Sequence, residues 1–204
     1  MRKIIPFTMV ELILALGVCA IGICSIMALI PVGANATRDA ALETYAASAG
    51  EQLLHFLEYS ATLSAQDWND TIGESGDAPI TGGKPEEQDL EFTIADLNNP
   101  DIWGGTIADN VYQGKENQQI YLIISHRNDE SIPLGDESFP EKIDFRAILA
   151  VWKEQISVNS NPIPYGTGAR LNVEVSWPAE LPYDARQKSL YCLTVFNPNY
   201  KASE

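Results

Sequence analysis

Apolar residues follow three successive patterns along the chain, and the first is an uninterrupted run near the N-terminus. Residues 12 to 30 contain no formally charged side chain. At 1.5 Å per residue, this run would form roughly 28 Å of α-helix, enough to cross the hydrocarbon core of a bilayer. We therefore predict a membrane-spanning helix in this segment.

The second pattern is amphipathic and begins just beyond Pro31 and Gly33. Acidic residues such as Glu43, Glu51 and Glu58 lie opposite an apolar stripe at spacings of three and four. The stripe comprises Leu42, Tyr45, Ala49, Leu53, Phe56 and Leu57. Because the pattern resumes directly after Pro31, we expect that proline to kink a continuous helix rather than to end it. The amphipathic part is predicted over 33–65, and residues 68–73 mark its end.

The third pattern is alternation, which fills the C-terminal part of the chain. Four segments have strand character, and Pro and Gly punctuate the connections between them. They are residues 120–124, 143–151, 171–177 and 191–196. Consecutive strands with one face to cover predict a roughly four-stranded antiparallel sheet packed on the amphipathic helix, which is an α+β fold.

Between the helix and the sheet, residues 66–118 are turn-rich and acidic, with twelve Asp or Glu against Lys84 and Lys115. Only Leu90, Phe92 and Ile94 alternate well enough for a short strand. We interpret this segment as a long connection whose acidity forms a solvated face. No EF-hand spacing is present, so no metal ligands are assigned.

The overall charge restricts the possible partners. The 204 residues carry a formal net charge of −15, and the pI is near 4.4. Such a surface would repel nucleic acid, so no nucleic-acid partner is expected. Docking to anionic lipid by general electrostatics is disfavoured in the same way.

Candidate catalytic chemistry is sparse. Cys19, Cys24 and Cys192 are expected to pack in apolar surroundings, and His55 and His126 are interpreted as surface residues. The sequence contains no nucleophile-elbow, P-loop or metal-binding Cys/His motif. We therefore expect no enzymatic activity, no catalytic residue, no metal and no cofactor.

The basic residues at the N-terminus set the expected orientation in a membrane. Arg2 and Lys3 precede the apolar run, and the next basic residue is Arg38. The positive-inside bias places the short N-terminus in the cytoplasm and the chain beyond about residue 32 outside. The tripeptide at 34–36, Ala-Asn-Ala, leaves open an alternative in which signal peptidase removes the whole segment.

Glu11 is the unexpected residue of the N-terminal segment, because it lies about one helical turn inside the apolar environment. An ionised carboxylate there is costly unless it is paired or reaches the interface. A cut before Phe7 would create an α-amine that Glu11 of a neighbouring subunit could neutralise, which would stabilise only the assembled state. In the alternative interpretation, the helix is a simple single-pass anchor and Glu11 lies at the headgroup level.

The segment Phe7-Thr8-Met9-Val10-Glu11-Leu12, with its basic leader and long apolar run, resembles the class III signal of type IV pilins and type II secretion pseudopilins. The resemblance implies cleavage before Phe7 by a prepilin peptidase, N-methylation of Phe7, and an assembly role for Glu11. The family usually has Gly before the cut, where this chain has Pro6. Proline fits a subsite shaped for glycine poorly, so we expect slow processing or a divergent peptidase.

The resemblance also implies a domain layout and a set of partners. The leader would be 1–6, the membrane and assembly half of the helix 7–32, and the pilin-like head 33–204, with its sheet over 119–197. Expected partners are further copies of the chain, other pilin subunits, the prepilin peptidase, the assembly machinery and the inner membrane. The predicted function is a major or minor subunit of a type IV pilus. The alternatives are a periplasmic type II secretion pseudopilin and a membrane-anchored binding module that does not polymerise.

Overall fold

The computed structural model describes residues 8–73, 79–108, 110–126, 134–135 and 143–200. One helix, α1 (Met9–Thr62), begins the described chain and is 54 residues long. The chain divides into two compact units, Met1–Glu43 and Thr44–Glu204, and α1 contributes residues to both. We call the second unit the head.

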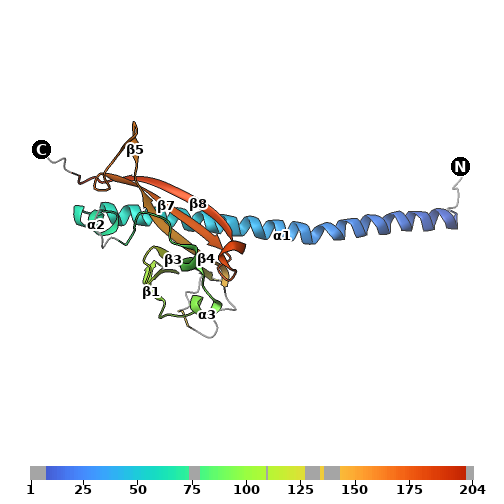
Figure 1. Cartoon of the computed structure of the whole chain (residues 1–204). Helices are drawn as coiled ribbons and strands as arrows, with labels where there is room; N and C mark the ends of the chain where they lie inside the picture. The colour runs from blue at the N-terminus through green and yellow to red at the C-terminus, as the bar shows by residue number, and fades with distance from the viewer. Residues whose placement is uncertain (1–7, 74–78, 109, 127–133, 136–142, 201–204) are drawn as a thin grey trace. The chain divides into compact units, whose positions relative to one another are not determined.

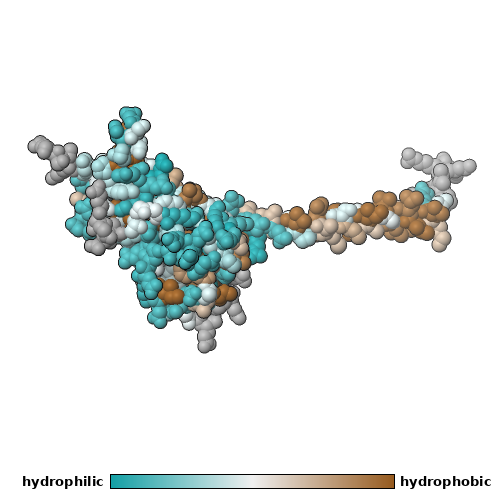
Figure 2. Space-filling model, in the orientation of Figure 1, coloured by the Kyte–Doolittle hydropathy of each residue, from teal (hydrophilic) through white to brown (hydrophobic). Residues whose placement is uncertain are grey.

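In the first unit, α1 is apolar and exposed. Residues 9–41 of the helix are solvent-accessible, and hydrophobic residues predominate on the visible face of the N-terminal part of the helix in Figure 2. By length and composition, α1 is the one helix among the described residues that could cross a membrane. The prediction of a long apolar N-terminal helix is confirmed, and the helix continues through Pro31 as expected.

In the head, the buried face of α1 consists mainly of small residues and leucines. It comprises Ala46, Ala49, Gly50, Leu53, Leu54, Leu57 and Ala61. Tyr45 and Phe56, which we had placed in the apolar stripe, are 47% and 37% exposed. The buried stripe is therefore rotated about the helix axis from the predicted one. The small side chains on this face let the helix lie close to the sheet.

The end of the helical region also differs from the prediction. α1 ends at Thr62, and a second helix, α2 (Ala65–Thr71), follows. The hydroxyl of Ser64 caps α2 by accepting a hydrogen bond from the Asp67 main-chain nitrogen at 3.1 Å. Trp68, which we had taken as part of a stop signal, is a buried residue of α2, and its Nε1 donates to the Tyr165 carbonyl oxygen at 2.9 Å.

The head contains a six-stranded antiparallel sheet with the order β1-β2-β3-β4-β7-β8 (Figure 1). Its strands are β1 (Trp103–Ala108), β2 (Val111–Gly114), β3 (Ile120–His126), β4 (Ile143–Glu154), β7 (Gly168–Trp177) and β8 (Gln187–Phe196). A separate hairpin pairs β5 (Ser157–Val158) with β6 (Asn161–Pro162). All four predicted strands are present. The expected count of four is too low, because β1 and β2 arise from the segment interpreted as a connection.

Both faces of the sheet are covered, as β4 demonstrates: residues 145–153 are all buried. On one face, Phe145 stacks with Tyr45 of α1 at a centroid distance of 5.8 Å. On the other face, Ile148, Ala150 and Trp152 belong to a core cluster with Leu90 and Tyr183. The sheet therefore lies between α1 and a second layer.

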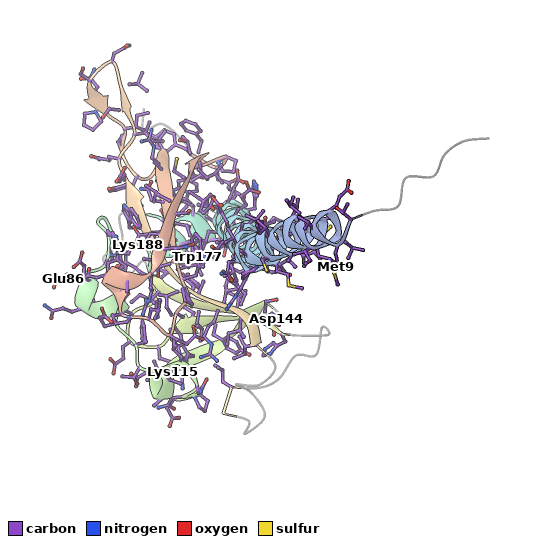
Figure 3. The ribbon with its side chains drawn as sticks, turned by 90° about the vertical axis from the view of Figure 1, so that its right-hand side faces the viewer. Met9, Glu86, Lys115, Asp144, Trp177 and Lys188 are labelled. Carbon is purple, nitrogen blue, oxygen red and sulfur yellow. The ribbon has the colours of Figure 1, made fainter. Side chains whose placement is uncertain are left out.

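The second layer is built largely from the acidic segment. It contains η1 (Glu87–Leu90), α3 (Ile94–Leu97) and, from further along the chain, η4 (Tyr183–Ala185), and it lies across the sheet from α1 in Figure 3. The short strand predicted at 90–94 is wrong. Thr93 and Asp96 form a capping box that starts α3 instead.

Candidate functional site

The first candidate site is the start of α1 around Glu11. Glu11 lies in the first turn of the helix and is exposed. Its main-chain nitrogen donates to the Thr8 carbonyl oxygen at 3.1 Å. The neighbouring Met9, Val10 and Ile13 are 84%, 71% and 66% exposed. A single carboxylate thus stands at the beginning of a helix whose other nearby side chains are apolar and uncovered. A carboxylate is also favoured there by the free N–H groups of the first turn.

The two residues predicted for processing, Pro6 and Phe7, lie outside the described residues. The geometry therefore locates the candidate assembly residue Glu11 but leaves the cut before Phe7 as a prediction.

The hydroxyl groups farther along α1 are satisfied within the helix. Ser25 Oγ donates to the Ile21 carbonyl oxygen at 2.8 Å, and Thr37 Oγ1 donates to the Gly33 carbonyl oxygen at 2.9 Å. Such bonds to the preceding turn remove the need for water around the hydroxyl. The apolar stretch can thus be surrounded by hydrocarbon without leaving these donors unpaired.

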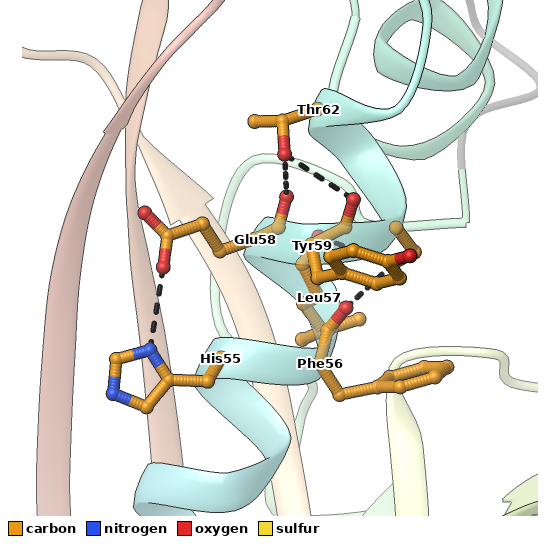
Figure 4. A network of polar contacts seen from close by, with 7 residues as sticks. His55, Phe56, Leu57, Glu58, Tyr59 and Thr62 are labelled. Atoms are coloured by element: carbon orange, nitrogen blue, oxygen red, sulfur yellow. Dashed lines mark hydrogen bonds and ion pairs between the residues drawn. The ribbon is translucent and has the colours of Figure 1, made fainter.

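His55 lies on the exposed side of α1 in the head, as the sequence predicts. Its Nδ1 is 3.3 Å from Glu58 Oε2, and the two side chains are 70% and 40% exposed (Figure 4). Farther along, Thr62 Oγ1 donates to the main-chain oxygen of Glu58 at 2.8 Å. The exposed contact between His55 and Glu58 contributes little to stability. His55 therefore lies on a solvent-exposed surface of the helix and is not part of a buried site.

His126 differs from the prediction, because it is buried rather than on the surface. Only 7% of it is exposed at the end of β3. Burial and the positive charge of Arg146 both lower the pKa of His126. Arg146 is itself buried and donates through Nη2 to Asn98 Oδ1 at 3.1 Å. Sequence reasoning missed this burial because the two residues become neighbours only through the pairing of β3 with β4.

Buried cations hold the segments of the head together, and none was singled out from the sequence. Lys153 Nζ donates to the carbonyl oxygens of Ile72 and Gly73, both at 2.7 Å. Arg186 donates through Nε to the Leu181 carbonyl oxygen at 2.7 Å and through Nη1 to that of Leu90 at 2.9 Å. Each cation satisfies two main-chain carbonyl groups of the head. We therefore assign both cations a structural role.

A third cation, Lys84, joins a small polar network. Its Nζ lies 2.7 Å from Glu174 Oε2 and donates to the Tyr183 hydroxyl at 2.6 Å. The same hydroxyl donates to Glu174 Oε1 at 2.6 Å. Burial lowers the pKa of Lys84, but these hydrogen bonds outweigh it and raise the pKa above the ordinary value. The network fixes the second layer to β7.

A hollow of about 440 Å³ lies beside α3 and β1. The acidic residues lining it are Asp89, Glu91, Asp96, Asp101 and Glu116. No group of three metal-ligating side chains occurs among the described residues. Asp89, Asp101 and Glu116 are exposed, as expected for a solvated acidic face.

No protein-family model, no curated protein and no solved structure matches this chain. The start of α1 is the most specific feature of the chain from which a function can be inferred.

Proposed function

We propose that this protein is a structural subunit of a filament of the type IV pilus kind, held in the inner membrane by α1 before assembly. One observation carries the proposal: an exposed apolar helix begins with a single carboxylate, Glu11, and continues into a separately compact head. The type II secretion pseudopilin is the closest variant of the same proposal.

The exposed apolar side chains of α1 need to be covered both before and after assembly, first by lipid and then by neighbouring subunits. Burying apolar surface contributes about 25 cal/mol per Å², so a helix coated with apolar residues is unstable in water. Lipid covers this surface before assembly, with the head outside the membrane. In the filament, neighbouring copies of the same helix replace the lipid. Because lipid tails are as apolar as the side chains, a polar pair must supply much of the specificity.

Glu11 supplies that polar pair in the proposal. After a prepilin peptidase cuts before Phe7, the new N-methylated amine lies four residues, or about one helical turn, before Glu11 of its own chain, and Glu11 of a neighbouring subunit can pair with it. The amine and the carboxylate neutralise each other only when the helices are in register. The pair therefore acts as a register device rather than as a source of stability for the single chain. The peptidase, the assembly machinery and other subunits are the partners, and the role is non-enzymatic.

The N-terminus of the mature protein tests the proposal. Protein isolated from its native membrane should begin at N-methylated Phe7, as shown by mass spectrometry of the N-terminal peptide. Pro6→Gly should increase the processed fraction, because glycine suits the expected subsite. A start at Thr37 would contradict the proposal in favour of signal peptidase, and an intact start at Met1 or Arg2 would favour a simple anchor.

A further inference from the structure

The two edges of the six-stranded sheet differ in regularity. β1, at one edge, pairs with β2 through a register that shifts twice. β8, at the other edge, pairs with β7 through ten consecutive residue pairs without a shift. Among the described residues, β7 is the only strand paired with β8. A regular ten-residue edge presents a row of main-chain donors and acceptors that another strand can satisfy.

The side chains of β8 do little to block such pairing. The strand contains neither Pro nor Gly and no acidic residue, although the chain carries a net charge of −15. Tyr191 and Val195 share the face that packs toward α1. The opposite face carries Lys188, Leu190, Cys192, Thr194 and Phe196, all exposed. Leu190 and Phe196 are 60% and 57% exposed, which leaves an apolar surface beside the open edge.

The one charged side chain of β8 interacts with its own subunit. Lys188 Nζ lies 3.5 Å from the centroid of the Tyr183 ring. Edge strands are commonly protected by a lysine that projects into the path of an incoming strand. Because Lys188 lies over Tyr183 instead, β8 lacks this protection.

We propose that β8 is an interaction surface for a second copy of this chain, with the two β8 strands pairing antiparallel about a two-fold axis. An identical strand satisfies the open hydrogen-bonding groups symmetrically, and the contact closes on two copies. Mutual repulsion between two strongly acidic molecules is smallest where neither copy presents a carboxylate. This pairing goes beyond the proposed filament, whose helices pack in an open-ended series.

Cys192 lies near the middle of β8 and can report on the pairing. Directly opposite residues of antiparallel strands have Cα atoms about 4.5–5.5 Å apart, which is within the span of a disulfide. If the axis passes near residue 192, the two thiols can be joined. The oxidation removes two electrons and two protons, and an added copper–phenanthroline complex accepts the electrons.

The test uses the full chain in detergent micelles with Cys19→Ser and Cys24→Ser, so that no thiol remains in α1. Single cysteines are placed in turn at 190, 192 and 194, which covers neighbouring registers, and each protein is treated with the oxidant or with a short thiol-specific crosslinker. We expect a covalent dimer from at least one of these positions. Leu190→Lys combined with Thr194→Lys, in the Cys192 protein, should cause loss of the dimer, because an axis at residue 192 places each new lysine directly opposite a new lysine of the other copy.

The matched control places the cysteine at Val158, with Cys192→Ser. Val158 is 54% exposed on the β5–β6 hairpin, outside the six-stranded sheet. Association through α1 alone would cross-link this position as well as those in β8. Absence of a dimer at all three β8 positions, or equal dimer at Val158, would overturn the proposal. Persistence of the dimer in the folded double-lysine variant would also overturn it.

Discussion

Tyr191 of β8 lies directly against Gly50 of α1. A Cβ atom at Gly50 would be only 2.5 Å from Cδ2 of the Tyr191 ring and 3.0 Å from its Cγ. Real Cβ contacts are not this short, so the helix and the edge of the sheet approach each other closely because residue 50 lacks a side chain. This contact links the packing of α1 to the position of β8.

Gly50→Ala should therefore destabilise the head by about 1–3 kcal/mol, the usual cost of overpacking a well-packed site. In an exposed helix position, the same change would stabilise by about 0.5–1 kcal/mol. Gly33→Ala is the matched control, since it lies in the same helix with nothing within 4 Å of the added Cβ. Denaturant unfolding, followed by near-UV circular dichroism, measures the free energy of unfolding of both variants. An unchanged midpoint for Gly50→Ala would contradict the observed packing.

Lys153→Met should cost about 1–3 kcal/mol, because two buried carbonyl oxygens lose their donor. These carbonyls directly follow α2, where a cation also complements the helix dipole. Lys115→Met is the control: Lys115 is exposed, and its Nζ donates to the Pro100 carbonyl oxygen at 3.0 Å. The control should change the free energy of unfolding by less than about 0.5 kcal/mol. Equal losses in the two variants would show that burial of Lys153 is unimportant.

Stability should fall as the pH rises from 10 toward 12, because Tyr121 is buried on β3. Burial raises the pKa of Tyr121 to about 12, against an ordinary value of 10.0. The folded state keeps the proton that the unfolded state loses over this range, so stability present below pH 10 is lost above it. The total is about 2–3 kcal/mol.

Tyr121→Phe should reduce this alkaline loss, since the phenol that titrates differently in the two states is gone. Leu122→Val, at the neighbouring buried position, should lower stability at every pH without changing the slope. Free energies of unfolding measured at several pH values between 9 and 12 would show whether Tyr121 causes the alkaline loss of stability. A slope in Tyr121→Phe equal to that of the unmodified protein would refute the assignment.

The strands predicted from the sequence were those whose alternation extends over a long segment. β1 and β2 were missed because their glycines, Gly104 and Gly114, resemble turn signals, while their pairing depends on β3. Gly114 lies so close to Asn117 and Ile120 that an added Cβ would be 2.7 Å from the Asn117 carbonyl oxygen. Gly114 is therefore required because a side chain would not fit there, and this steric requirement is apparent only from the folded structure.

One other difference has a local cause that is present in the sequence. The spacing of Thr93 and Asp96 is a helix-start signal, which outweighs the alternation of Leu90, Phe92 and Ile94. Covering of the second face could not be predicted, because Leu90, Leu97 and Trp103 pack there through contacts distant in sequence. The structure shows Glu11 in the first turn of α1, and its assembly role stays a prediction.

The incorporation of Glu11→Ala into filaments tests whether Glu11 acts in assembly. The subunit is quantified in sheared filaments by co-sedimentation, at equal membrane levels, beside Asp39→Ala as an exposed acidic control on the same helix. Insertion should be unimpaired or easier, because a carboxylate costs about 2–3 kcal/mol at mid-membrane and less near the interface. An assembly role for Glu11 predicts reduced incorporation of Glu11→Ala and unchanged incorporation of Asp39→Ala. Equal incorporation of Glu11→Ala and the unmodified protein would contradict it.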